Sequence, residues 1–323
     1  MKKIRIKFVD FATDFNTKDN EFTKILEEKY NVEIVDKNPE YVFHSSFGNN
    51  YLNYDCIRIF YTGECITPDF NLTDYALAFD RISFGDRYLR MPLYRLFQYR
   101  KKYDMLFDRP KTDSIDKSKE FCNFVVSNCF ADDIRLKIYE ALSRYKKVNS
   151  GGRFRNNVGG PVPDKFEFQR KHKFSIAFEN GIYDGYATEK IVDAFAAGTI
   201  PIYLGDPRIH LDFNEESFIN GHRFSCLEDL VKKVEEIDND DDKYLKMLNA
   251  NPIIQDQRSN EDLRLFLYNI FDQDIDVAKR RPCSRYSKEY VHFLKRHKFY
   301  EDVIHSKIIR VKKILYRLRH GAV

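Results

Sequence analysis

The amino-acid sequence predicts an α/β protein built from two Rossmann-like domains. The chain has 323 residues, which is enough for two α/β domains of ordinary size, each with its own core. Strand-like and helix-like segments alternate with short loops over the first 61 residues. A second alternating set starts near residue 121, after a polar stretch. Together these observations favour two parallel-sheet domains joined by a linker.

The first domain is expected to open with a strand over residues 4–11, IRIKFVDF, and a helix over about 20–30. Three further strands are expected at residues 32–35, 41–44 and 56–61. We take residues 101–120 as the linker, because they are mostly charged or polar and contain Pro110. The N-terminal domain is then residues 1–118.

The second domain is expected over residues 119–284, with a strand at 121–127 and helices near 133–145 and 226–237. Its most informative part is residues 173–207, KFSIAFENGIYDGYATEKIVDAFAAGTIPIYLGDP. This segment predicts a strand, a glycine-punctuated loop, a helix and a second strand at 200–204. Thr188 is placed to cap the helix and Gly198 to end it.

A strand–loop–helix–strand unit places its loop at the carboxyl end of the first strand, where phosphorylated ligands bind. Unpaired amides at the start of a helix attract anions. Glu189 and Lys190 lie in that first helical turn, so Lys190 could neutralise a diphosphate and Glu189 could accept hydrogen bonds from a sugar. The alternative is that both are ordinary surface charges.

Three segments resemble the α-1,3-fucosyltransferase family, and in particular its bacterial members. The enzymes of this family use GDP-fucose. FEN…GYATEKIVDAFAAGTIPIYLGDP resembles its donor-binding signature. RIFYTGECITPDFNLTDYALAFDRISFGDRYLRMPLY, residues 58–94, resembles its acceptor-side segment. FCNFVVSNCFADDIRLKIYEALSRYKKVNSGGRFRNNVGG, residues 121–160, resembles the beginning of its nucleotide domain. The resemblance implies the GT-B architecture, in which two Rossmann-like domains face a cleft.

The resemblance also implies one carboxylate base in the acceptor domain, at Glu64 in the sequence Tyr61-Thr62-Gly63-Glu64. Glu64 falls where the strand at 56–61 is expected to end, so its carboxylate would project from the carboxyl edge of the sheet. Glu64 could otherwise be a polar strand terminus. Asp69 and Asp74 are the further candidates for the base.

On the donor side, the resemblance carries over Arg135, Asn180, Tyr186, Glu189 and Lys190. Arg135 and Lys190 would bind the diphosphate, because a guanidinium makes bidentate contacts with phosphate. Arg135 could instead pair within its helix with Asp132 or Glu140. Asn180 could be a turn residue and Tyr186 a packing residue.

Two departures from the family pattern concern tryptophan, which this chain lacks. Many relatives carry Trp where this chain has Leu204, a position expected behind the site. The Trp-rich loop after the first strand is replaced by Asp10-Phe11-Ala12-Thr13, which puts acceptor preference in question.

The sequence predicts no metal and no cofactor. Six cysteines are scattered without zinc-ligand spacing, and are expected to be reduced thiols. Asp238, Asp240, Asp241 and Asp242 could suggest a DxD metal site, but the run EEIDNDDDKY is more typical of a solvated loop between helices.

The end of the chain, residues 285–323, is expected to be a basic amphipathic helical tail. Ile304, Ile308, Val311, Leu315 and Leu318 follow a helical spacing among Lys and Arg residues. Such a helix could bind an anionic membrane surface or pack on protein. A net charge of +4 gives no reason to expect a nucleic-acid partner. The start MKKIRIKFVDF has no apolar run typical of a signal peptide, so a cytoplasmic enzyme is expected, peripheral on the inner membrane face.

The resemblance implies inverting transfer of L-fucose from GDP-fucose to the 3-hydroxyl of N-acetylglucosamine, in an N-acetyllactosamine-type oligosaccharide bound by the N-terminal domain. Two alternatives stay open. One is a GT-B enzyme with a different nucleotide sugar, and the other is a non-catalytic glycan- or nucleotide-binding protein on a transferase scaffold.

Overall fold

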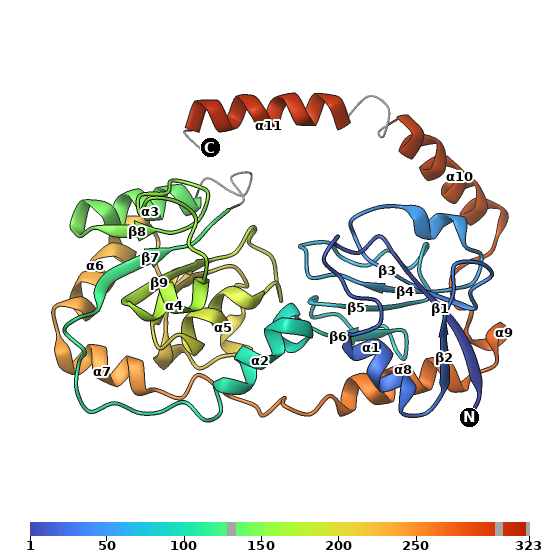
Figure 1. The fold of residues 1–323 in the computed structure, drawn as a ribbon, viewed down its shortest axis with the longest axis horizontal. Coiled ribbons are helices and arrows are strands. Elements are labelled where there is room, and N and C mark those ends of the chain that lie inside the picture. Colours follow the sequence, from blue (N-terminus) through green and yellow to red (C-terminus); the bar gives the residue numbers. More distant parts are fainter. Residues whose placement is uncertain (128–133, 301–305, 321–323) are drawn as a thin grey trace. The chain divides into compact units, whose positions relative to one another are not determined.

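The computed structural model describes residues 1–127, 134–300 and 306–320, which divide into two units. Unit 1 comprises residues 1–97 and 257–311, and unit 2 comprises residues 98–256 together with 312–323 where described. Each unit contains one parallel β-sheet with helices against it (Figure 1). The predicted α/β class with two Rossmann-like sheets is therefore confirmed.

The sheet of unit 1 has the strand order β2-β1-β3-β4-β5-β6, and every neighbouring pair is parallel. Its strands are β1 (Lys3–Val9), β2 (Asn31–Ile34), β3 (Tyr41–His44), β4 (Ile57–Tyr61), β5 (Tyr75–Ala78) and β6 (Tyr88–Arg90). Its helices are α1 (Glu21–Glu27), α8 (Glu261–Asp272), α9 (Ile275–Ala278) and α10 (Arg285–Tyr300). The strand register brings the ends of β3 and β4 side by side, since His44 pairs with Phe60.

The sheet of unit 2 has the strand order β11-β10-β9-β7-β8, again parallel throughout. Its strands are β7 (Glu120–Phe124), β8 (Val148–Ser150), β9 (His172–Phe178), β10 (Ile200–Leu204) and β11 (Ile219–Asn220). Its helices are α2 (Phe97–Met105), α3 (Ile134–Tyr145), α4 (Lys165–Arg170), α5 (Glu189–Ala196), α6 (Leu227–Asp238) and α7 (Asp241–Asn249). Short 3-10 helices occur in both units, at Asn50–Asn53, Leu93–Arg95, Ile209–Leu211, Glu215–Ser217 and Gly221–Arg223.

The strand–loop–helix–strand unit predicted around residue 185 is present as β9, α5 and β10. Thr188 occupies the N-cap position of α5 with an extended backbone, and Gly198 follows the helix with φ +66°. A positive φ suits glycine at this position because glycine has no Cβ to clash with the helix carbonyls. The predicted boundaries of this unit are correct to within one or two residues.

The linker prediction is partly wrong. Residues 101–105 belong to helix α2, which is anchored in unit 2 by an ion pair between Lys102 and Asp193 (2.8 Å). Asp193 has a buried carboxylate on α5 and also binds Lys165 (2.6 Å). The start of the expected linker is therefore part of a folded unit.

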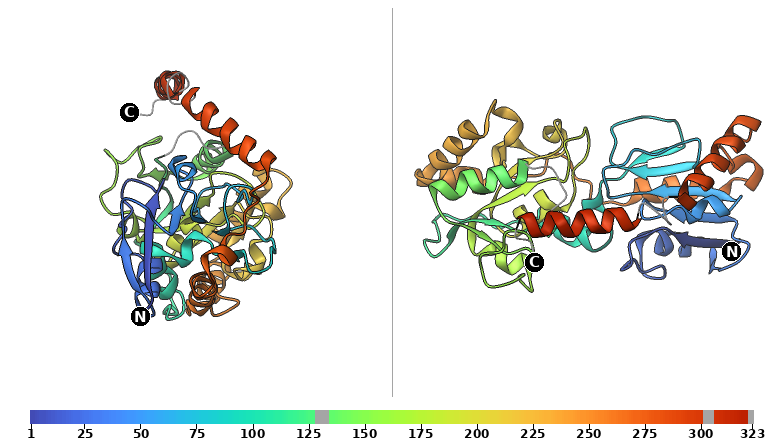
Figure 2. Two further views of the ribbon diagram at one scale, coloured as in Figure 1. Left: turned by 90° about the vertical axis from the view of Figure 1, so that its right-hand side faces the viewer. Right: turned by 90° about the horizontal axis from the view of Figure 1, so that it is seen from above.

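The expected boundary at residue 284 also differs from the structure, because residues 257–311 return to unit 1. Leu263, Leu267 and Ile270 of α8 are fully buried in one core with Ile4 and Ile59 of the sheet. Apolar residues buried to this degree contribute about 1.5–3 kcal/mol each. Unit 1 is therefore assembled from two separate stretches of the chain (Figure 2).

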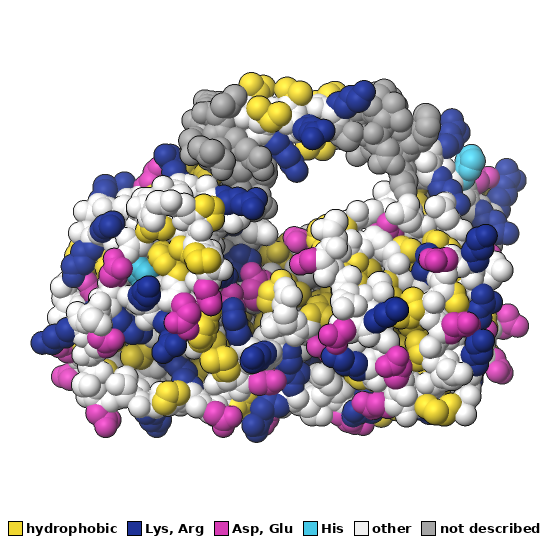
Figure 3. Space-filling view, viewed as in Figure 1, with side chains coloured by type: hydrophobic (Ala, Val, Ile, Leu, Met, Phe, Trp, Pro, Cys, Tyr) yellow, Lys and Arg dark blue, Asp and Glu magenta, His cyan; other side chains and the backbone are white. Residues whose placement is uncertain are grey.

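The C-terminal helices differ from each other in their surroundings. Val291 and Leu294 of α10 pack on the buried residues Val42 and Leu52 of unit 1, so α10 is not a tail outside the compact sheet domains. Helix α11 (Ser306–His320) exposes its apolar side chains wherever they are described, namely Ile308, Ile309, Val311, Ile314 and Leu315. Figure 3 shows basic and apolar side chains next to one another on the described part of this helix. Ile304 lies outside the described residues, and the side chain of Leu318 is not described.

Candidate active site

The candidate donor site is built around Glu179, the first residue after β9, whose side chain is completely buried. Its carboxylate accepts hydrogen bonds from the backbone N–H of Thr188 and from the Thr188 hydroxyl, both at 2.7 Å. Thr188, the N-cap residue of α5, forms no side-chain bond to the backbone of the helix, and its hydroxyl donates to Glu179 instead. Glu179 therefore fixes the position of the first turn of the helix relative to the strand.

Lys190 completes this cluster. Its ammonium donates to Glu179 Oε2 at 2.8 Å and to Thr188 Oγ1 at 2.9 Å. Burial alone would lower the pKa of Lys190, but the two carboxylates of Glu179 and Glu189 raise it well above its usual range. The Lys190 ammonium is thereby held at the carboxyl edge of the sheet between two carboxylates.

Glu189 lies beside Lys190, with 3.7 Å between the carboxylate and the ammonium. Burial favours the protonated form of Glu189, but the charges of Lys190 and Lys165 outweigh it and lower the pKa to about 2. Glu189 is therefore ionised near neutral pH and is able to accept hydrogen bonds from hydroxyl groups.

Arg135 and Asn180 meet at the same edge of the sheet. Arg135, in the first turn of α3, is buried, and its Nη1 donates to Asn180 Oδ1 at 3.0 Å. Asn180 directly follows Glu179 in the chain, and Glu179 binds Lys190. Arg135 and Lys190 are therefore each hydrogen-bonded to one of two consecutive residues. Of the alternative partners, Glu140 forms an ion pair with Arg155, and Asp132 lies outside the described residues.

Tyr186 is almost completely buried, and its carbonyl accepts a hydrogen bond from the Tyr203 hydroxyl at 3.4 Å. The Tyr186 side chain therefore packs inside unit 2, and its predicted part in donor binding stays a prediction. Asp206, also buried, accepts from the backbone N–H of Gly185 at 2.8 Å and holds the loop before α5 in place.

Sequence reasoning did not single out Glu179 or Asp206. A signal for Glu179 was available, because an ionisable residue directly after a buried strand needs a partner. The neighbouring Gly205 has a related role, since a Cβ there would lie 2.4 Å from Glu179 Cγ. Only glycine leaves room for the Glu179 side chain in this cluster.

In unit 1, Glu64 lies in the turn that follows β4. Its backbone N–H donates to Thr62 Oγ1 at 3.0 Å, and its carbonyl accepts from Ile66 at 2.7 Å. The residue is exposed, and no ion pair reaches its carboxylate from the residues that the structure describes. The turn is therefore well defined, while the carboxylate lies at the surface and is accessible.

The other two candidates for the base differ from Glu64. Asp74 is completely buried and binds the guanidinium of Arg281, as well as three backbone N–H groups, those of Arg58, Arg280 and Arg281. It holds the C-terminal segment to the sheet and is not placed to act as a base. Asp69 is partly buried and accepts hydrogen bonds from Asn71 (2.8 Å) and from the Tyr290 hydroxyl (3.1 Å).

The structure describes both positions at which the chain departs from the family pattern. Leu204, at the end of β10, is partly buried and packs against the apolar core of unit 2. Asp10, in the loop that replaces the Trp-rich segment, has φ +62° and accepts hydrogen bonds from Asn50 (2.8 Å) and Tyr51 (2.9 Å). This loop is therefore tied to the segment after β3.

The acidic run near residue 240 is not a solvated loop as expected. Asp238, the last residue of α6, is buried and forms ion pairs with Lys146 and Lys173. Asp240 caps α7 by accepting from the backbone N–H of Lys243 at 3.0 Å. Within the described part of the chain, no cluster of three His, Cys, Asp or Glu residues has a geometry suited to a metal ion.

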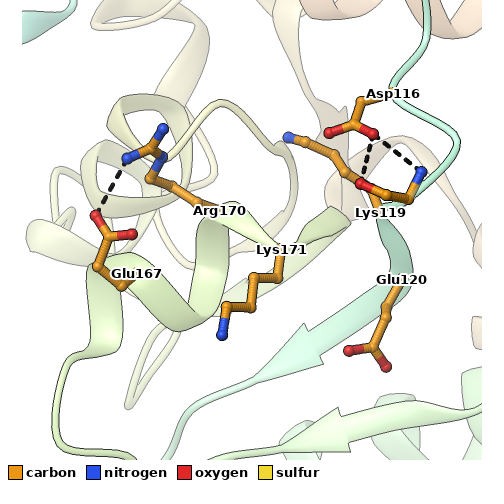
Figure 4. Close-up of a pocket in the computed structure, with 7 residues that line it drawn as sticks. Asp116, Lys119, Glu120, Glu167, Arg170 and Lys171 are labelled. Carbon is orange, nitrogen blue, oxygen red and sulfur yellow. Dashed lines mark hydrogen bonds and ion pairs between the residues drawn. The ribbon is translucent and has the colours of Figure 1, made fainter.

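A polar pocket of about 320 Å³ lies at the opposite edge of the unit 2 sheet (Figure 4). Its residues flank the amino ends of β7 and β9, and include Glu120 and Lys171. Two residues that line the pocket, Glu167 and Arg170, form an ion pair at 3.2 Å. The donor residues all follow the carboxyl ends of strands or begin helices there, so this pocket is separate from the candidate site.

Comparison with known proteins identifies the family. A model described as the N-terminal domain of the α-(1,3)-fucosyltransferase FucT matches residues 6–97. The model of the C-terminal part of glycosyltransferase family 10 (fucosyltransferase) matches residues 114–251. The α-(1,3)-fucosyltransferase FucT of Helicobacter pylori is 37% identical over 266 residues, covering 71% of this chain and 55% of that protein.

A mouse protein, 4-galactosyl-N-acetylglucosaminide 3-α-L-fucosyltransferase 9, is 34% identical over 137 residues, which is 41% of this chain and 37% of its own length. This chain therefore spans about half or less of the curated relatives it matches. A crystal structure described as α1,3-fucosyltransferase with GDP-fucose is 30% identical, with a TM-score of 0.71, and the match covers 85% of this chain and 92% of that one. A second structure of an α1,3-fucosyltransferase is 31% identical, with a TM-score of 0.74, and covers 84% and 91%.

These matches define the class of the protein as a glycosyltransferase fold with two Rossmann-like domains, in agreement with the predicted GT-B architecture. The chain belongs to glycosyltransferase family 10, the α-1,3-fucosyltransferases. The resemblance found in the three sequence segments is thereby confirmed.

Proposed function

We propose that the chain transfers L-fucose from GDP-fucose to the 3-hydroxyl of N-acetylglucosamine in an N-acetyllactosamine-type glycan. The observation that carries this proposal is the placement of two buried or half-buried cations, Lys190 and Arg135, at the carboxyl edge of the unit 2 sheet, in a chain of this family. A relative of 30% identity whose structure is described with GDP-fucose supports the choice of donor.

In the proposed reaction, Glu64 accepts the proton of the acceptor 3-hydroxyl as its oxygen attacks the anomeric carbon of fucose. The bond from that carbon to the phosphate oxygen breaks on the opposite face, so the configuration inverts. Lys190 and Arg135 stabilise the negative charge that grows on the departing diphosphate. Glu189, ionised at neutral pH, binds hydroxyl groups of the nucleotide ribose or of the fucose.

Neither a metal ion nor a cofactor has a step in this mechanism, because two side-chain cations take over the neutralisation of the diphosphate. We therefore propose that transfer proceeds in the presence of a chelator. An activity that EDTA abolishes and Mn²⁺ restores would contradict this assignment of Lys190 and Arg135.

A donor–acceptor panel tests the proposed function. The purified chain is incubated with GDP-fucose, GDP-mannose and UDP-sugars against N-acetyllactosamine and its component sugars, and the linkage of the product is determined by NMR. We expect GDP release with GDP-fucose and an α-1,3-linked fucose on N-acetylglucosamine. Transfer from another donor would favour the alternative GT-B enzyme, and thermal stabilisation by GDP without turnover would favour a binding protein.

We further propose that α11 binds an anionic membrane surface, where Lewis-type glycans such as those of lipopolysaccharide are assembled on the cytoplasmic side. Exposed Ile308, Val311 and Leu315 on a helix with Lys307, Arg310, Lys312 and Lys313 support this role. No helix in the described ranges is both long and apolar enough to cross a bilayer. Deletion of residues 300–323 should abolish sedimentation with anionic vesicles, and unchanged sedimentation would refute the proposal.

A further inference from the structure

Helix α5 carries two carboxylates on one face. Glu189 and Asp193 are four residues apart in this helix, so their side chains lie on successive turns. Two like charges at this spacing repel each other and destabilise a helix. The Asp193 side chain is 3% exposed and that of Glu189 is 20% exposed, so water does little to weaken the repulsion. This face of α5 therefore needs cations from other elements.

Two lysines from two other helices bind Asp193. Lys102 of α2 donates to Asp193 Oδ1 at 2.8 Å, and Lys165, the first residue of α4, donates to Oδ2 at 2.6 Å. Their side chains are similarly exposed, at 29% and 32%. The Lys102 ammonium also lies 5.7 Å from the centre of the Phe166 ring, so α2 and α4 contact each other beside Asp193. As partners of Asp193, the two lysines are nearly equivalent.

The two lysines differ in their effect on Glu189. Burial would raise the pKa of Glu189, but the charges of Lys190 and Lys165 lower it to about 2. Among the described residues, no ion pair joins Lys165 directly to Glu189, so Lys165 acts on it from its position on Asp193. Lys102 is not one of the main charges of the described residues that act on Glu189. Lys165 therefore interacts with both carboxylates of this face.

Charges of opposite sign consequently alternate from α2 to the carboxyl end of β9. Their order is Lys102, Asp193, Lys165, Glu189, Lys190 and Glu179. Lys165 is the cation between the buried carboxylate of Asp193 and the donor-site carboxylate of Glu189. Without Lys165, Asp193 would keep a single cation and would repel Glu189 on the preceding turn more strongly. This repulsion would move the Glu189 carboxylate away from its present position beside Lys190.

We propose that Lys165 is a positioning residue of the donor site, whose ammonium separates Glu189 from Asp193 and so holds Glu189 where it accepts hydrogen bonds from hydroxyl groups of the donor. Lys165 acts through Glu189 in this assignment and is not itself a contact of the donor. The inference rests on the proposed function for the identity of the donor. Lys102, by contrast, fixes α2 on unit 2 and has no part in donor binding.

The test uses Lys165→Met and Lys102→Met as a matched pair, because each removes one of the two cations on Asp193 and keeps an unbranched apolar side chain. Lys165→Arg restores the charge. Glu189→Gln, alone and combined with Lys165→Met, completes a thermodynamic cycle with wild type. Affinities for GDP and GDP-fucose are measured by calorimetry, kcat and KM by GDP release, and the ionisation of Glu189 by ¹³C NMR. Circular dichroism verifies that each variant is folded.

We expect Lys165→Met to weaken GDP-fucose binding and to raise its KM about three- to tenfold, the loss typical of one hydrogen bond, with kcat nearly unchanged. The NMR titration should show the pKa of Glu189 moving from about 2 towards its ordinary 4.5. Lys102→Met and Lys165→Arg should bind within about twofold of wild type. In the Glu189→Gln background, Lys165→Met should cause no further loss.

Equal losses in Lys165→Met and Lys102→Met, or a loss that persists in the Glu189→Gln background, would show that Lys165 only supports the fold and would overturn the inference. A loss with both GDP and GDP-fucose supports it and places Glu189 at the ribose, whereas a loss with GDP-fucose alone supports it and places Glu189 at the fucose. If wild type binds GDP-fucose and the variants show this pattern, but no fucose is transferred, the role of Lys165 stands and the proposed transfer falls.

Discussion

Replacing Glu179 by Gln removes the negative charge beneath Lys190 while preserving the size of the side chain. The carboxylate accepts two hydrogen bonds from Thr188 and one from Lys190, all between 2.7 and 2.8 Å. A Gln amide oxygen can retain one of these acceptor positions, but its NH₂ group faces donors that it cannot satisfy. Glu179→Gln should therefore destabilise unit 2.

The magnitude follows from the burial of the pair. Removing one partner of a buried ion pair typically costs about 3–5 kcal/mol, because the remaining charge is left uncompensated. Here the Lys190 side chain retains 19% exposure and Glu189 stays 3.7 Å from its ammonium, which favours the lower end of that range. We expect a loss of about 3 kcal/mol, and for a unit of this length a fall in melting temperature of roughly 6–12 °C.

Because the chain contains no tryptophan, unfolding is followed by circular dichroism and calorimetry rather than by indole fluorescence. Glu179→Gln, Lys190→Met and the double variant form a thermodynamic cycle, for which we expect a coupling energy of about 2 kcal/mol. Glu167→Gln is the control, since its pair with Arg170 is more than half exposed on both sides and contributes little. A coupling energy below about 0.5 kcal/mol, or equal losses in Glu179→Gln and the control, would refute the assignment of Glu179 as the residue that positions Lys190.

Three further perturbations test other parts of the molecule. Glu64→Gln should lower kcat about 10²- to 10⁴-fold with little change in the KM for GDP-fucose, as for the loss of a general base, and a wild-type rate would exclude Glu64 from that role. The pKa of Glu189 is lowered to about 2 from an ordinary 4.5, which contributes about 3 kcal/mol to the free energy of unfolding above pH 4.5 and is lost as the pH falls towards 2. Acid titration followed by circular dichroism should show this loss in wild type and not in Glu189→Gln. Identical acid profiles would contradict the charge assigned to Glu189. Leu267→Ala in α8 should lower the free energy of unfolding of unit 1 by about 2–5 kcal/mol, measured by urea denaturation. The control Leu265→Ala should cost far less, because Leu265 is 60% exposed. Equal losses in the two variants would contradict the packing of α8 on the sheet.

Local patterns predicted much of the fold. The strand β3 was predicted with its actual bounds, and β9, α5 and β10 nearly so, because alternating apolar residues and a terminal glycine are signals contained in a few consecutive residues. The three-residue strands β6 and β8 were not predicted, since alternation cannot be recognised over so short a length. The assignment of α8 to unit 1 also failed, because it depends on contacts between residues more than 200 positions apart.

The candidate site divides in a similar way. Four donor-side residues were predicted from sequence motifs shared with the family. The structure brings them to one edge of the unit 2 sheet: Arg135, Asn180, Glu189 and Lys190. Glu179 and Asp206 were not singled out, because their roles arise from burial and from their hydrogen bonds to the backbone rather than from residue type. A residue at the end of a strand looks the same in sequence whether it faces a ligand or a neighbour.

The two-part construction of unit 1 bears on how the polypeptide matures during synthesis. All of residues 98–256 leave the ribosome before α8 does, so the second unit can complete its core while the first still lacks the helix that covers one face of its sheet. Until residue 272 has emerged, the apolar side chains of that face remain available to chaperones or to other nascent chains. Premature termination between residue 256 and the start of α8 should therefore yield an aggregation-prone product in which only the second unit is native.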